Sequence, residues 1–131
     1  MKKQPPKKGV FKAISELLCA VIQPRKFRYI SAEQLQSRIC SGEETTVVDC
    51  RDSESYKECH IPGSVNIPYT EFMTKYNTVD FKNSNIVTVC YAGYYSRAAA
   101  QKYGRAGCLK VASLLGGMDA WLKSKMPTTE N

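Results

Sequence analysis

The chain has 131 residues, of which 43% are hydrophobic and 24% are charged, and its formal net charge is +7. This length and composition fit one globular domain and argue against a disordered chain, a collagen or a coiled coil. No apolar run approaches the ~18 residues of a membrane-spanning helix. We therefore expect a protein that is soluble or attached at most to the periphery of a membrane.

The positive charge is concentrated at the amino terminus. Residues 1–28 contain eight basic side chains and one acidic side chain, whereas the rest of the chain contains eleven of each. Because a nucleic-acid-binding domain normally carries its basic patch on the folded body, we expect no nucleic-acid partner. The pattern divides the chain into a basic leader, residues 1–26, and a folded domain, residues 27–131.

Within the leader, the stretch from Val10 to Ile22 has the pattern of a short amphipathic helix that ends before Pro24. The apolar residues at helical spacing are Phe11, Ile14, Leu18 and Val21. This face could pack on the domain or on a second copy, bind a protein partner, or lie in an anionic membrane surface beside the leader's lysines. Ser15 and Glu16 interrupt the apolar stretch and no cleavage site follows, so we do not expect a secretory signal peptide.

The cysteines give no metal-site pattern. There are six of them and one histidine, and no Cys-x-x-Cys pair occurs. The chain is also long enough to form a core without disulfides, which belong mainly to small secreted domains. We therefore expect a cytoplasmic protein with reduced thiols and no bound metal, in which any cysteine in special surroundings is a candidate nucleophile.

From residue 27 onward, short apolar strands alternate with helices. The predicted strands span residues 27–30, 46–50, 65–67, 86–90 and 109–115. The predicted helices span residues 32–39, 53–59, 70–76, 96–103 and 118–124, and Ser31 with Gln34 gives the first of them a capping-box pattern. This alternation predicts an α/β fold with a mainly parallel sheet covered by helices on both faces.

The end of the predicted strand 86–90 is the best candidate for a functional site, because ligands bind at the carboxyl ends of parallel strands. That strand ends in Cys90, and we expect the next helix to begin about six residues later, at Ser96. Gly93 between them can adopt a positive φ, and the amides of such a turn together with a helix amino terminus can surround an anion. The same field favours the thiolate of Cys90 as a nucleophile. The alternative is an inert cysteine buried at a strand end. The candidate binding loop is Tyr91, Ala92, Gly93, Tyr94, Tyr95 and Ser96.

Three stretches carry a recognisable set of motifs: VVDCRDSESYKECHIPGSVNIPY at 47–69, CYAGYYSRAAAQ at 90–101 and LLGGMDAWLKSKMP at 114–127. In this order they resemble the single-domain rhodanese-like sulfurtransferases, the thiosulfate sulfurtransferase family. The resemblance covers residues 27–128 and leaves the leader out. It implies a three-layer rhodanese-like fold with a mainly parallel central sheet.

The resemblance also implies a reaction. Cys90 would take a sulfane sulfur from thiosulfate or a persulfide donor and pass it, as a cysteine persulfide, to a thiol or to cyanide. The main-chain amides of the loop would hold the donor and then the persulfide. No metal or organic cofactor is implied.

Several other positions match the family pattern or depart from it. By the resemblance, Asp49 and Arg51 tie the strand end to the loop, and Asp52 assists them. His60 is expected to be a hydrogen-bonded turn residue rather than a base. Cys59 replaces the family's usual glycine before His60, so either the turn tolerates a side chain or the thiol lies near the site, where it could act as a resolving thiol.

Two other functions stay open. Phosphatases that share this fold use Cys-x5-Arg, whereas Arg97 here follows Cys90 at a spacing of Cys-x6-Arg, so a phosphatase is disfavoured. A non-catalytic docking or regulatory module is the other alternative, with the leader recruiting it. Cys50 ends a strand that the family fold places beside Cys90, and it could act as a resolving thiol.

The loop has tyrosines where many family members have a cation. Tyr91, Tyr94 and Tyr95 occupy these positions. We therefore expect thiosulfate to bind weakly, and a less charged or protein-bound persulfide to be the better donor. The alternative is that these tyrosines only line the pocket.

Overall fold

A parallel sheet of five strands forms the centre of the structure, a computed structural model that describes residues 24–131. The strand order is β1-β5-β4-β2-β3, and each pair of neighbours is parallel. The strands are β1 (Arg28–Ile30), β2 (Thr46–Asp49), β3 (Val65–Asn66), β4 (Asn85–Val89) and β5 (Lys110–Leu114). The predicted α/β fold with a parallel sheet is thereby confirmed.

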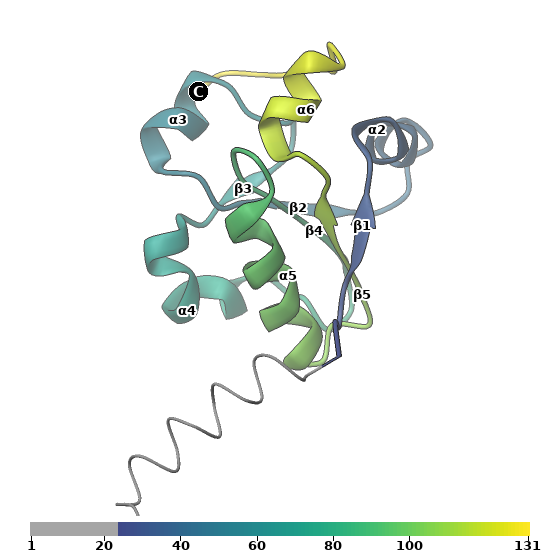
Figure 1. Cartoon of the computed structure of the whole chain (residues 1–131), viewed down its shortest axis with the longest axis vertical. Helices are drawn as coiled ribbons and strands as arrows, with labels where there is room; N and C mark the ends of the chain where they lie inside the picture. The colour runs from purple at the N-terminus through teal and green to yellow at the C-terminus, as the bar shows by residue number, and fades with distance from the viewer. Residues whose placement is uncertain (1–23) are drawn as a thin grey trace, which may run out of the picture.

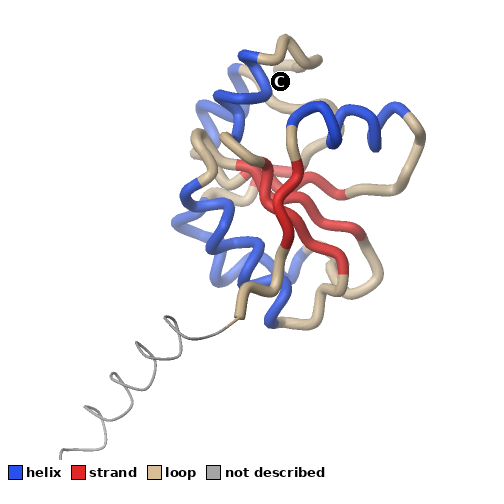
Figure 2. The backbone as a smooth tube through the Cα atoms, turned by 45° about the vertical axis from the view of Figure 1, so that its right-hand side comes forward, coloured by secondary structure: helices blue, strands red, loops and turns tan. Residues whose placement is uncertain are grey.

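Helices cover both faces of this sheet, so that the fold has three layers (Figures 1 and 2). The helices are α2 (Ala32–Cys40), α3 (Ser53–Glu58), α4 (Phe72–Lys75), α5 (Tyr94–Arg105) and α6 (Gly117–Lys123). Helices α4 and α5 lie on one face, and α2 and α6 lie on the other. The capping box predicted for α2 is present, because Ser31 and Gln34 exchange side-chain and backbone hydrogen bonds.

Alternating strand residues build two separate cores. Val48 and Ile86 face α5 and pack with its Tyr103, whereas Val47 and Val87 face α2 and α6 and pack with residues such as Trp121. This alternation follows from the two-residue period of a strand, and both faces are apolar because both are covered. The cysteines that follow β2 and β4 lie in the core on the α5 side.

Most predicted boundaries agree with the structure to within about two residues, and two predicted helices differ in an informative way. Helix α5 begins at Tyr94 rather than at Ser96, because Gly93 adopts φ 97° and turns the chain within one residue. The predicted helix 70–76 is one α-helical turn between two 3-10 turns, η1 (Tyr69–Glu71) and η2 (Tyr76–Thr78). Hydroxyls of Thr74 and Thr78 donate to main-chain carbonyls three residues earlier, which competes with a continuous helix.

The described chain is attached to α5 from its first residues. The amide of Lys26 donates to the side chain of Gln101, which in turn donates to the carbonyl of Pro24. The predicted amphipathic helix 10–22 lies outside the described residues. Within residues 24–131, none of the helices is both long enough and apolar enough to span a membrane.

Candidate active site

Cys90 follows the last residue of β4 and is the point on which several donors converge. The backbone amides of Gly93 and Ser96 donate to its Sγ over 3.1 Å and 3.4 Å. The hydroxyl of Ser96 lies 3.4 Å from the same sulfur. Cys90 is only 2% exposed, so its sulfur is buried beneath the loop. A negatively charged sulfur would be stabilised here by amides and by the amino terminus of α5.

The start of α6 supports this loop from behind. The amides of Met118 and Asp119 donate to the carbonyls of Cys90 and Tyr91 over 2.8 Å and 2.9 Å. Gly117 makes the close approach possible, because a Cβ atom there would overlap both carbonyls. The glycine pair in the LLGG motif therefore fixes the conformation of the cysteine loop.

A chain of buried hydroxyl groups leads from Cys90 into the sheet. The Oγ of Ser96 lies 2.9 Å from the Oγ of Ser113 in β5. Beside it, the hydroxyl of Thr88 in β4 donates to the carbonyl of Ser96 over 2.6 Å. Ser96, Ser113 and Thr88 are all fully buried. Ser113 and Thr88 belong to no motif and were not predicted as site residues; the signal in the sequence is a hydroxyl group in an otherwise apolar buried strand.

Asp49 and Arg51 form a buried ion pair at the end of β2. Nε and Nη2 of Arg51 donate to the Asp49 carboxylate over 2.9–3.2 Å, and Nη2 also donates to the carbonyl of Cys59. Burial opposes the charge of Arg51, but the hydrogen bonds and charge of Asp49 outweigh it, so that the pKa of the guanidinium is raised. The side chain of Asn66 donates to the carbonyls of both residues of the pair. Arg51 is thus occupied in holding the β2–α3 connection.

Asp52 is linked directly to the cysteine loop. Its carboxylate caps α3 by accepting from the amide and hydroxyl of Ser55, and it also accepts a short hydrogen bond from the Tyr91 hydroxyl. The hydroxyl of Ser55 lies 2.6 Å from that of Tyr91. The bond from Tyr91, followed by those from Ser55, lowers the pKa of Asp52 to about 2. Asp52 therefore holds Tyr91 in place and keeps a negative charge at the edge of the site.

His60 and Arg97 have no recorded contact with the sulfur of Cys90. The ring of His60 is buried, stacks on Tyr56 at 3.8 Å between centroids and lies 2.7 Å from its carbonyl through Nδ1. The main chain of His60 pairs with Thr129. Arg97 is exposed on α5, with its guanidinium 5.5 Å from the ring centre of Tyr94. His60 thus has the surroundings of a turn residue.

Cys50 lies beside Cys90 but has different surroundings. Its amide donates to the carbonyl of Val89 over 2.7 Å, and both cysteines belong to the core on the α5 side. Burial, followed by the negative charge of Asp49 and electrostatic repulsion from the neighbouring Cys90 sulfur, raises the pKa of the Cys50 thiol. Its protonated form is therefore favoured, which argues against a resolving role. Cys59 is partly buried, and its carbonyl rather than its thiol takes part in the contacts of Arg51.

Exposed tyrosines surround the candidate site and form what we call the aromatic rim: Tyr69, Tyr91, Tyr94 and Tyr95. The rings of Tyr69 and Tyr95 lie 4.3 Å apart, and those of Tyr94 and Tyr95 lie 5.3 Å apart. Tyr94 and Tyr95 were predicted in the loop but belong to the first turn of α5. The aromatic rim combines Tyr69 with residues of the cysteine loop and α5, and its exposed rings offer apolar surface to a partner.

The chain is similar to known proteins in both sequence and structure. The sequence profile of the family described as Rhodanese-like domain matches residues 31–124. The "Putative sulfur carrier protein YrkF" of Bacillus subtilis is 34% identical over 92 residues, which are 70% of this chain and 49% of that protein, so the chain spans about half the length of this curated relative. The crystal structure of a rhodanese-related protein from Thermoplasma volcanium has a TM-score of 0.73 at 26% identity and covers 80% of this chain and 100% of its own. The rhodanese-like domain of an Anabaena protein has a TM-score of 0.71 at 27% identity and covers 79% of each chain.

Proposed function

Because the chain belongs to the family of rhodanese-like domains, we propose that it is a sulfurtransferase in which Cys90 carries a sulfane sulfur as a persulfide. The observation that supports the proposal most directly is the convergence of the Gly93 and Ser96 amides on the Cys90 sulfur. Amide donors stabilise an anionic sulfur, both as the attacking thiolate and as the persulfide that follows.

The reaction has two balanced half-reactions. The Cys90 thiolate attacks the outer sulfur of thiosulfate or of a persulfide; a bond forms from Sγ to that sulfur, and the donor's own sulfur–sulfur bond breaks. Its electron pair leaves with sulfite or with a thiolate. The acceptor, a thiolate or cyanide, then attacks the outer sulfur of the Cys90 persulfide and releases the Cys90 thiolate. A covalent relay of this kind gives ping-pong kinetics.

A persulfide carried on a peptide or protein fits the site better than thiosulfate. Arg51 is occupied by Asp49, and Arg97 lies over the ring of Tyr94. Within residues 24–131, no cationic side chain is recorded in contact with Cys90. The carboxylate of Asp52 adds a negative charge at the same edge, which disfavours a dianion such as thiosulfate. The aromatic rim offers instead an apolar surface for the chain that bears the persulfide.

The two alternative functions predict different behaviour. A phosphatase needs its arginine beside the nucleophile, whereas the guanidinium of Arg97 is held over Tyr94. A non-catalytic docking module needs no reactive thiol, whereas the sulfur of Cys90 has two amide donors. Both features favour the sulfurtransferase.

The test is the intact mass of the full chain after incubation with thiosulfate or with a peptide persulfide. We expect the mass of one sulfur atom to be gained, faster with the peptide persulfide, and then lost when a thiol is added. Cys90→Ser should gain none, whereas Cys108→Ser, which changes a buried cysteine outside the site, should behave as the original chain. Failure to gain sulfur from any donor, or an equal gain by Cys90→Ser, would contradict the proposal. Release of phosphate from an aryl phosphate by the same protein would support the phosphatase.

A further inference from the structure

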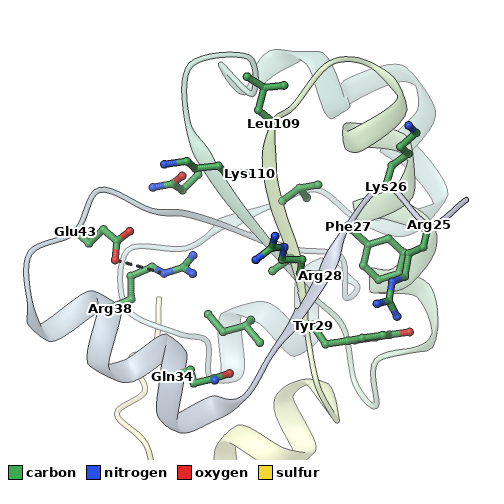
Figure 3. Close-up of a pocket in the computed structure, with 14 residues that line it drawn as sticks. Arg25, Lys26, Phe27, Arg28, Tyr29, Gln34, Arg38, Glu43, Leu109 and Lys110 are labelled. Atoms are coloured by element: carbon green, nitrogen blue, oxygen red, sulfur yellow. Dashed lines mark ion pairs between the residues drawn. The ribbon is translucent and has the colours of Figure 1, made fainter.

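A groove of about 850 Å³ lies along the edge strand β1 (Figure 3). Its lining includes the first residues of three strands, Arg28 of β1, Asn85 of β4 and Lys110 of β5. Cys90 follows the far end of β4, a strand of five residues. At about 3.3 Å per residue, the length of β4 places Cys90 roughly 16 Å from Asn85 in the groove lining, and none of the residues that donate to its sulfur lines the groove. The groove is therefore a second surface rather than part of the candidate active site.

The groove is strongly basic. Residues 24–131 contain fourteen basic and eleven acidic side chains, and the groove is lined by five of the basic ones and one acidic one: Arg25, Lys26, Arg28, Arg38, Lys110 and Glu43. Arg28 from β1 and Arg38 from α2 extend into the space between those elements (Figure 3). Among the residues that line the groove, Arg38 forms an ion pair with Glu43 at 3.6 Å. Arg25 lies over the rings of Phe27 and Tyr29, at 5.6 Å and 4.8 Å from their centres. The groove and its rim thus present a surplus of positive charge.

We propose that this basic groove and its rim bind an anionic membrane surface. A negatively charged lipid surface attracts lysine and arginine side chains close to it, and the attraction grows with their number. Tyr29 is exposed at this surface, and Leu109 is 91% exposed at its edge, which provides apolar groups for the interfacial region. A mixture of basic and exposed apolar groups favours a lipid surface over an acidic peptide or a nucleic acid, for which charge alone would suffice.

The sequence that precedes the groove extends the same charge. Residues 1–23 contain five lysines and one glutamate, and they join the domain at Pro24, directly before Arg25. The hydrogen bonds of Gln101 to Pro24 and Lys26 fix this junction on the domain. The charge of the leader sequence therefore joins the domain directly beside the groove.

This arrangement has a consequence for the active site. The start of β1 and the end of β4 lie at opposite ends of the sheet (Figure 1). A membrane bound at the groove would leave Cys90 and the aromatic rim directed away from the lipid. A sulfur donor or acceptor in solution could then reach the site while the protein stays bound.

The test is sedimentation of the full chain with vesicles of phosphatidylcholine mixed with phosphatidylglycerol, compared with phosphatidylcholine alone. We expect binding to the anionic vesicles only, weakened by salt. At about 1 kcal/mol for each basic side chain at the surface, the triple variant Arg25→Gln/Arg28→Gln/Lys110→Gln should lose about a hundredfold in partition coefficient. The matched control is Lys57→Gln/Lys75→Gln/Lys123→Gln, which removes the same charge from α3, α4 and α6 and should lose little.

Each other outcome would overturn the proposal. Equal losses in the two triple variants would mean that total charge, and not the groove, decides binding. An unchanged groove variant, with binding lost only on Lys→Gln changes at positions 2, 3, 7, 8 and 12, would assign the membrane contact to the leader alone. Groove-dependent binding of RNA or of an acidic peptide without vesicle binding would assign the groove to another polyanion. The folding of the variants is checked by circular dichroism melting and by sulfur uptake. We expect the groove changes to affect neither.

Discussion

The amide nitrogen of Gly93 lies 3.1 Å from the sulfur of Cys90, three residues earlier in the chain. This contact requires the positive φ of 97° at Gly93, which lets α5 start at once and directs the amide of Ser96 at the same sulfur. The reactivity that we propose for Cys90 thus depends on the backbone conformation of a single residue.

The first prediction concerns that conformation. Gly93→Ala forces a side chain into a left-handed conformation at a cost of about 1–2 kcal/mol, so Tm should fall by about 5–15 °C. Because the donor amide also moves, sulfur uptake should slow by about 10- to 100-fold, as when one anion-binding donor is removed from an active site. Gly107→Ala is the matched control, because Gly107 has φ 110° and open space around it, far from Cys90 in the sequence. It should lower Tm similarly and leave uptake unchanged; equal slowing in both variants would contradict the prediction.

The second prediction concerns the buried hydroxyl chain. In Ser113→Ala, the hydroxyl of Ser96 loses its partner in β5 and is no longer directed towards the sulfur by a cooperative hydrogen bond. At about 1 kcal/mol for one hydrogen bond, alkylation of Cys90 and sulfur uptake should both slow about fivefold. Ser64→Ala is the control, because its buried hydroxyl has no hydrogen-bond partner among the described residues; it should change neither rate. If alkylation and sulfur uptake are unchanged in Ser113→Ala, the prediction is contradicted, and the buried hydroxyl groups have a structural role only.

Local sequence signals predicted most of the fold. Apolar β-branched runs marked the strands, and the Ser31–Gln34 capping box marked the start of α2. The start of α5 was misjudged because its cap is a glycine whose φ, rather than a side-chain hydrogen bond, ends the turn. The sequence indicated that Gly93 could adopt a positive φ, but no capping side chain marked that the helix begins directly after it.

The parts of the site that sequence reasoning missed are contacts between distant segments. Ser113 meets Ser96 across 17 positions, and Tyr91 meets Asp52 across 39. Such contacts depend on the register of β4 with β5 and on the position of α3 relative to the cysteine loop. Motif order predicted which segments converge but not which hydroxyl groups meet.

The third prediction concerns the buried ion pair. In Arg51→Leu, the carboxylate of Asp49 stays buried without its partner, at a cost of about 3–5 kcal/mol, so Tm should fall by about 12 °C or more. Asp49→Asn/Arg51→Leu should be less destabilised than Arg51→Leu, because no buried charge is left alone. Lys75→Gln breaks an exposed ion pair with Glu71 and should lower Tm by less than about 4 °C. Thermal unfolding of the four proteins checks this, and a double variant no more stable than Arg51→Leu would contradict it.

The last prediction concerns pH. The folded-state pKa of Asp52, about 2, lies below its unfolded value of about 3.9, so the ionised carboxylate stabilises the fold above pH ~4, and this contribution is lost as pH falls towards ~2. Tyr91→Phe removes the largest cause of that shift. It should therefore lower Tm at neutral pH and raise the pKa of Asp52 measured by NMR. The difference in Tm from the original chain should shrink as pH falls from ~4 to ~2.

Tyr94→Phe is the matched control for this pH dependence. Tyr94 is 70% exposed, and its hydroxyl has no recorded hydrogen bond within residues 24–131. Its removal should leave both Tm and the pKa of Asp52 unchanged across the same pH range. A Tm difference for Tyr91→Phe that is constant from neutral pH to pH ~2 would mean that the phenol stabilises the loop by packing, and that Asp52 does not hold the cysteine loop through its charge.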